Sequence, residues 1–171
     1  MKNLVFFAAL SVAFFSCSGN RQAQSVTSES VFELDNLLTV VDQKLEDTVT
    51  VVGYVTHTCK HSGRRCFIVG ESQKASLRVE AEGEIGSFSQ ELVGSKLSIT
   101  GIVREYRLGQ EYIAEMEKSV NQRIVEENGS AETCAAELSN IADMRKWMKD
   151  NDKDYYVIYY MDGLSYQVVK E

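Results

Sequence analysis

The segment TVTVVGYVTHTC, residues 48–59, decides the fold of this chain. Valine and threonine dominate it, and such β-branched residues favour a strand because they pack well on a pleated surface. Gly53 interrupts the run at a point where a bulge or a sharp coil of the strand would fit. We therefore expect a long first strand over residues 48–59.

Four further strands are predicted downstream, at residues 65–70, 76–81, 96–106 and 111–120. The segment 96–106 alternates apolar and polar side chains, as a half-buried strand does. A short helical connection is expected at 88–93, between the third and fourth strands. Leu108-Gly109 is expected to form the turn that leads into the fifth strand.

Helical patterns occur on both sides of this five-strand region. Residues 31–45 carry apolar side chains near helical spacing and predict a short lead-in helix. Ser130 is a suitable N-cap for a second helix that should end near Lys149. Asp162-Gly163 then separates two apolar runs and is the pair most suited to a type I′ hairpin turn. We expect a C-terminal helix followed by a Tyr-rich β-hairpin.

Five strands, with a glycine in a long first strand and a helix between the third and fourth, resemble the OB-fold, a small and partly open Greek-key barrel. The resemblance covers residues 48–120, and another small barrel with the same number of strands is the alternative. The run VTVVGYVTHTCKHSGRRC at 49–66 is similar to the first hairpin of small exported bacterial OB-type lipoproteins. That family is poorly characterised and implies no established activity. The predicted fold class is mainly β, a five-stranded OB-like Greek-key barrel with a C-terminal helix and β-hairpin.

The N-terminal region has the layout of an export signal. Lys2 supplies a short positive region, residues 4–15 are almost purely apolar, and Ser16-Cys17 follows. A membrane-spanning helix needs roughly 20 apolar residues, and this run stops after about a dozen. The junction resembles a bacterial lipobox, although the two residues before Ser16 are bulkier than usual. We expect Cys17 to carry a lipid that anchors the protein in the cell envelope; an ordinary secretory signal with an incidental cysteine is the alternative.

The expected organisation has four parts: a signal peptide at 1–16, the lipidated cysteine with a flexible tether at 17–30, an OB-like barrel with its lead-in helix at 31–127, and a helix plus Tyr-rich hairpin at 128–171. Without the signal peptide, 17 basic residues face 25 acidic ones and the net charge is −8. Nucleic-acid-binding domains are usually basic. The charge therefore argues against nucleic acid as the partner.

Most of the strong soft-ligand side chains beyond Cys17 gather in one segment, residues 57–66: His57, Cys59, His61 and Cys66. A four-residue turn over 61–64 would set Cys59 directly opposite Cys66. Directly opposite residues have Cβ atoms roughly 4.5 to 5.5 Å apart, and a disulfide needs about 3.5 to 4.5 Å. The predicted hairpin could therefore bring the two sulfurs together with a slight adjustment.

Three uses of this cluster stay open. Cysteines in an oxidising compartment usually form disulfides, so a structural bridge between Cys59 and Cys66 is the first. His57 lies on the same strand face as Cys59, so His57, Cys59 and Cys66 could instead hold zinc or copper, with His61 joining them if the turn curls back. The third use is a redox-active pair in which nearby basic residues lower a thiol pKa. No other cofactor is indicated.

A basic rim is the second candidate site. In OB-folds the loops after strands one and four border the ligand face, and here they carry five basic residues: Lys60, Arg64, Arg65, Arg104 and Arg107. This rim could receive a phosphate, an acidic glycan or a nucleic-acid strand; solvated loop charge is the alternative. The sequence has no motif that predicts a Ser-His-Asp set or a dinucleotide-binding loop, so we expect no enzyme.

These features predict a lipid-anchored extracytoplasmic binding module that takes a soft metal ion or another small ligand at the first hairpin. A structural or interaction lipoprotein with a Cys59–Cys66 disulfide and a protein partner is the second hypothesis. An exported redox module or nucleic-acid-binding module is the third.

Overall fold

The computed structural model describes residues 30–126 and 129–170, so the predicted signal peptide, Cys17 and nearly all of the expected tether lie outside the described residues. A short strand β1 (Val31–Glu33) leads into helix α1 (Leu34–Thr39) and the 3-10 turn η1 (Val41–Lys44). The lead-in helix is thus shorter than expected, because its first three residues pair in parallel with the next strand.

Within the described ranges, no helix is both long enough and apolar enough to cross a membrane.

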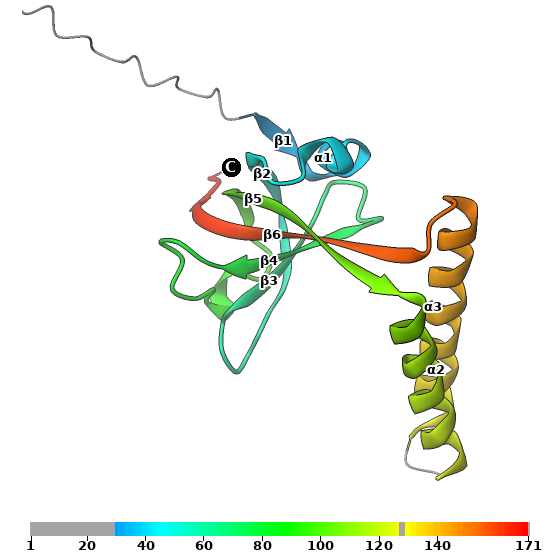
Figure 1. Cartoon of the computed structure of the whole chain (residues 1–171). Helices are drawn as coiled ribbons and strands as arrows, with labels where there is room; N and C mark the ends of the chain where they lie inside the picture. The colour runs from blue at the N-terminus through cyan, green and yellow to red at the C-terminus, as the bar shows by residue number, and fades with distance from the viewer. Residues whose placement is uncertain (1–29, 127–128, 171) are drawn as a thin grey trace, which may run out of the picture.

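Five strands close into a barrel (Figure 1). They are β2 (Thr48–Thr58), β3 (Arg65–Val69), β4 (Ser76–Ala81), β5 (Lys96–Gly109) and β6 (Tyr155–Val168). Their order around the barrel is β2-β3-β4-β6-β5, and β5 pairs with β2 to close it. Neighbours are antiparallel except β4 and β6, which run parallel. This is an OB-like Greek-key barrel, so the predicted mainly β class and five-stranded OB-like barrel are confirmed.

The connection between the third and fourth barrel strands contains a short helical turn, as expected. The 3-10 turn η2 (Gln90–Leu92) begins after Ser89, whose side-chain oxygen accepts a hydrogen bond from the backbone N–H of Glu91. Leu92 and Phe88 are buried against the barrel interior. The interior is filled by apolar side chains from every strand, including Val51, Ile68, Val79, Ile99 and Met161.

The strand predicted at residues 111–120 is wrong, because helix α2 (Gln110–Val125) covers that segment. Its apolar side chains recur every three or four positions, which is the period of a helix rather than of a strand: Ile113, Met116, Val120 and Ile124. The second predicted helix is confirmed as α3 (Ala131–Asp150), with the Ser130 hydroxyl accepting the N–H of Thr133 at 3.1 Å.

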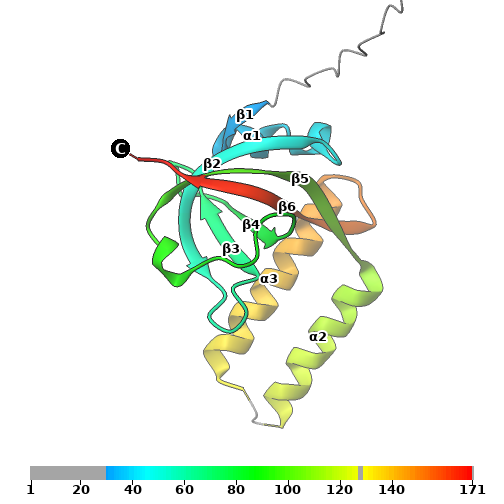
Figure 2. The same cartoon turned by 90° about the vertical axis from the view of Figure 1, so that its left-hand side faces the viewer.

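Helices α2 and α3 form an antiparallel hairpin that projects from the barrel between β5 and β6 (Figures 1 and 2). The helices have a small apolar core of their own, which also packs against β5 and β6, the strands before and after them in the chain. Its buried members are Leu108, Ile113, Val120, Cys134, Ile141 and Met148. The helical hairpin is therefore an insertion into the last barrel connection.

The prediction of a C-terminal β-hairpin is also wrong, because residues 155–168 form one strand that lies between β4 and β5. Gly163 pairs with Gly101 at a register shift and makes no left-handed turn. A Cβ atom at Gly163 would lie 2.7 Å from Cγ1 of Val79, so glycine is required there for space. Strand β6, which the expected boundary at residue 128 assigns to the C-terminal part, is thus a strand of the barrel.

Candidate functional site

The first hairpin, between β2 and β3, holds the predicted His and Cys residues. The Cys59 N–H donates a hydrogen bond to the carbonyl of Arg65 at 2.9 Å, and the Gly63 N–H donates to the carbonyl of Cys59 at 2.9 Å. Gly63 has a φ of 62°, a left-handed conformation that favours glycine. These contacts set the turn that carries Lys60 and His61 at the exposed tip.

Cys59 and Cys66 do not face each other, so that prediction is wrong. Cys66 pairs with Thr58, because the turn begins one residue earlier than predicted, with the Cys59 N–H bonded to the carbonyl of Arg65. A one-residue shift moves side chains to the opposite face of a strand. Cys66 accordingly lies in the barrel core with none of its surface exposed, whereas Cys59 is half-buried on the outside. Both thiols are free.

The predicted metal ligands are likewise not brought together. The His57 side chain is exposed, with its ring centroid 5.9 Å from that of Phe67. Cys66 points away from it into the core. Across residues 30–126 and 129–170, no group of three or more His, Cys, Asp or Glu side chains is arranged to hold a metal ion. The geometry therefore offers His57 and Cys59 without the third ligand that the sequence suggested.

The two hairpin thiols differ strongly in their electrostatics. Hydrogen bonds from the Ser62 hydroxyl, at 3.4 Å, and from the backbone of Ser62 and His61 lower the pKa of Cys59 to about 7. Burial raises the pKa of Cys66 to about 12, because the core does not solvate a thiolate. Cys59 is thus partly ionised at neutral pH, and Cys66 stays protonated.

The four arginines of the predicted basic rim are paired with neighbouring acids, and Lys60 lies exposed at the tip of the first hairpin. Arg64 pairs with Glu82 at 3.1 Å and Arg65 pairs with Glu80 at 3.0 Å. The other two arginines lie on β5 rather than in a loop: Arg104 contacts Glu46 and Asp162, and Arg107 contacts Glu105. These hydrogen bonds raise the pKa of both guanidinium groups. An anionic ligand would have to displace the carboxylates that already occupy this rim.

A row of aromatic and guanidinium groups crosses the outside of the barrel. Strand register places its members side by side on five strands: His57, Phe67, Arg78, Tyr160 and Arg104. The Arg78 guanidinium lies over the Tyr160 ring, 5.0 Å from its centroid, and both side chains are half-buried. Sequence reasoning missed Tyr160 because it placed this residue in a separate hairpin. We call these five residues the outer row.

Glu80 fixes the charge at the centre of the outer row. Its carboxylate lies 3.1 Å from Nε of Arg78 and 3.0 Å from Nε of Arg65. The Arg78 contact is an ion pair without the alignment of a hydrogen bond, so this Nε has no hydrogen-bond partner among the described residues. The centre of the row therefore combines a stacked ring, a neutralised guanidinium and a buried N–H without a hydrogen-bond partner.

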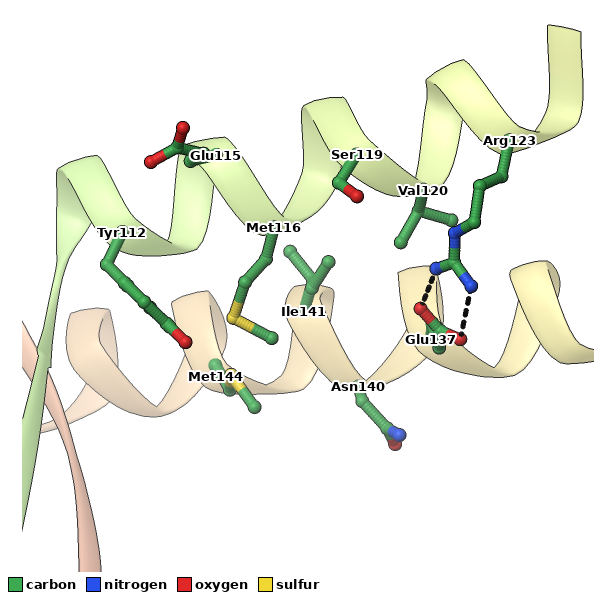
Figure 3. Close-up of a pocket in the computed structure, with 10 residues that line it drawn as sticks. All are labelled: Tyr112, Glu115, Met116, Ser119, Val120, Arg123, Glu137, Asn140, Ile141 and Met144. Carbon is green, nitrogen blue, oxygen red and sulfur yellow. Dashed lines mark hydrogen bonds and ion pairs between the residues drawn. The ribbon is translucent and has the colours of Figure 1, made fainter. Parts of the chain in front are cut away.

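A second surface feature lies between α2 and α3 (Figure 3). It is a groove of about 390 Å³, and its lining residues are Tyr112, Glu115, Met116, Ser119, Val120, Arg123, Glu137, Asn140, Ile141 and Met144. Met116 and Met144 extend toward each other from the two helices. The missed sequence signal was the helical spacing of apolar residues over 110–125, which the expected fifth strand had absorbed.

Comparisons with known proteins find a weak structural likeness. No protein-family model and no curated protein matches the chain. Among solved structures, it is similar to a chain described as "a putative aspartyl-tRNA synthetase from Leishmania major Friedlin", with 13% sequence identity and a TM-score of 0.41. The match covers 88% of this chain, which spans only 23% of that one. A likeness this weak carries no argument on function, so the site must be argued from its geometry.

Proposed function

We propose that this chain is a lipid-anchored binding module that works outside the cytoplasm and holds its ligand on the outer face of β3, β4 and β6. The observation that carries the proposal is the centre of the outer row, where the Arg78 guanidinium stacks on Tyr160 beside Phe67. Rings and planar guanidinium groups on an open sheet face are a stacking platform for a flat ligand.

The position of the outer row in the fold supports this choice of face. OB-folds bind ligands on the outer face of their second and third strands, between the first and the last inter-strand loops. Those strands are β3 and β4 here. The first hairpin borders one end, where the Ala81 N–H donates to the carbonyl of Arg64 at 2.7 Å. The inserted helices border the other end, because they precede Tyr155 at the start of β6.

The charges favour an uncharged ligand. The guanidinium groups of Arg65, Arg78 and Arg104 each contact a carboxylate, so the face offers no surplus positive charge. A phosphodiester strand gains most of its affinity from unpaired cations, and the chain without its signal peptide carries a net charge of −8. A neutral oligosaccharide has flat apolar faces that can stack on the rings. Its hydroxyls can form hydrogen bonds with Glu80 and Arg78. We therefore take a neutral oligosaccharide as the favoured ligand class.

The location outside the cytoplasm rests on the N-terminal sequence alone. Residues 4–15 are apolar, follow Lys2 and end just before Cys17, which is the order of an export signal with an attachment cysteine. The proposal adds a fatty acyl anchor, such as palmitate, at Cys17. It does not include zinc, copper or a redox step at the first hairpin, because Cys66 points into the core and Cys59 has no second thiol facing it.

The test uses the chain from residue 18 onward. Every residue of the barrel core lies between Leu34 and Met161, so this chain keeps the whole core. The probes are neutral oligosaccharides, a uronic-acid oligosaccharide and oligothymidylate, and the readout is the ring C–H signals of the two histidines in NMR titrations. A neutral oligosaccharide should shift His57, which lies in the outer row, more than His61 at the hairpin tip.

Matched variants make the test specific. Tyr160→Ala removes a stacking ring worth on the order of 1 to 2 kcal/mol, so binding should weaken about 5- to 30-fold. Tyr112→Ala removes an exposed tyrosine on α2, away from this face, and should leave affinity unchanged. Equal losses in both variants, or unmoved His57 signals with every probe, would refute the ligand face. Preferential binding of oligothymidylate would keep the face but overturn the ligand class.

A further inference from the structure

The helical hairpin leaves one apolar face uncovered. Two helices bury the side chains between them, but the groove on one side of the pair exposes Met116, Met144 and Tyr112, the last with 51% of its surface exposed (Figure 3). Unbranched methionine side chains adapt to different partners and are frequent on helix-binding surfaces. This groove lies on α2 and α3 and shares no residue with the outer row.

The groove continues toward the barrel. A second hollow of about 420 Å³ shares Asn140 and Met144 with the first and adds Asp143, Trp147 and Tyr156. From Glu137 to Trp147 the helix advances ten residues, which is about 15 Å at 1.5 Å per residue. The combined groove therefore matches about three turns of a docked helix. Its far end is closed by Arg123, which forms a bidentate ion pair with Glu137 (Figure 3).

Acidic side chains border the groove on both outer edges. Glu115 is exposed on α2, points away from α3 (Figure 3) and pairs with no basic side chain in the described part of the chain. Asp143 is exposed on α3, and the neighbouring Lys146 forms its ion pair with Asp150 instead. Arg145 is turned to the other side of the pair, where it contacts Glu117 at 2.7 Å. The open groove is thus apolar along its floor and negative at its edges.

We propose that this groove binds an amphipathic helix of a partner protein, with apolar side chains on one face and basic side chains beside them. Such a helix would complete a three-helix bundle, with its apolar face on Met116 and Met144 and its basic side chains over Glu115 and Asp143. Helix-in-groove docking of this kind uses apolar anchors one turn apart. The charge of the two edges selects a basic partner helix over an acidic one.

The experiment follows methionine methyl groups by NMR in the chain from residue 18 onward. Three 18-residue peptides serve as probes: a Leu/Lys peptide with helical apolar spacing, a scrambled peptide of the same composition, and a Leu/Glu peptide with the same spacing. The Leu/Lys peptide should shift the methyl signals of Met116 and Met144 and bind at least tenfold more tightly than the other two peptides. Added salt should weaken its binding. Met161, fully buried in the barrel, should not move.

Two lysine variants locate the site. Met144→Lys places a positive charge on the groove floor and should weaken Leu/Lys binding at least tenfold. Ala142→Lys adds the same charge at an exposed position of α3 outside both hollows and should have little effect. An unchanged Met161 signal shows that the barrel of either variant is folded, and unchanged helical circular dichroism shows that α2 and α3 are folded.

Three results would overturn the proposal. One is equal weakening by both lysine variants. Another is equal binding of the scrambled peptide or the acidic peptide. The third is a shift of Met116 and Met144 with protein concentration alone, which would identify a second copy of the chain as the occupant.

Discussion

Replacing Gly163 with asparagine distinguishes a barrel strand from a hairpin turn. In a type I′ turn asparagine is well tolerated, because it adopts positive φ readily. In β6 a Cβ atom at this position would lie 2.7 Å from Val79 Cγ1 and 3.2 Å from Ile85 Cδ1. Overpacking costs about 1 to 3 kcal/mol, and a buried amide without partners costs about 1 to 3 kcal/mol more. We expect Gly163→Asn to lower the free energy of unfolding by about 2 to 6 kcal/mol.

Urea denaturation measures this loss, with Gly94→Asn as the matched control. Gly94 has a φ of 89° and open space around its Cα, so asparagine there meets no neighbour. Its cost should be limited to the backbone conformation, about 1 to 2 kcal/mol. Gly163→Ala is the milder companion in case the asparagine variant does not fold. Equal destabilisation by the two asparagine variants would refute the requirement for space at Gly163.

Three further predictions concern the anchor, the first hairpin and the helices. Cys17→Ala should abolish incorporation of labelled palmitate and release the protein from membrane fractions; retained label in the membrane would disprove the anchor. The rate of Cys59 alkylation by iodoacetamide should rise only about tenfold between pH 6 and pH 8 and then level off, because the thiol pKa is about 7. For a thiol with an unshifted pKa the rate would rise nearly a hundredfold over the same range. Cys66 should react only on unfolding. Ile141→Ala, at a buried position between α2 and α3, should cost about 2 to 5 kcal/mol and speed amide exchange in the helices more than in β2; uniform acceleration would show that helices and barrel unfold as one unit.

The first four barrel strands could be predicted because their signals are local. The β-branched run at 48–58 and the alternation over 96–106 are visible in single segments of the sequence. The fifth strand could not be recognised in the same way, because β6 owes its extended form to partners on both sides. Asp162-Gly163 is a strong turn signal in isolation, but pairing with β4 and β5 overrides it.

The candidate site shows the same division between local and long-range information. The clustering of His57, Cys59 and Cys66 is a property of the sequence, and the structure does place them in the first hairpin. Which residue lies opposite Cys66 depends on where the turn begins, and no local pattern shows that it begins after Cys59 rather than after Lys60. The predicted pairing of Cys59 with Cys66 therefore failed by a single residue.

Strand β6 connects the two proposed surfaces. Side chains alternate along a strand, so Tyr156 and Tyr160 lie on the same side of β6, about 13 Å apart at 3.3 Å per residue. Tyr156 lines the groove of the helical hairpin and packs against its core, whereas Tyr160 belongs to the outer row. An extended ligand that ran from the outer row past Tyr156 would meet a helix docked on α3. If both proposals hold, a partner helix docked on α3 would therefore limit the length of ligand that the barrel face can hold.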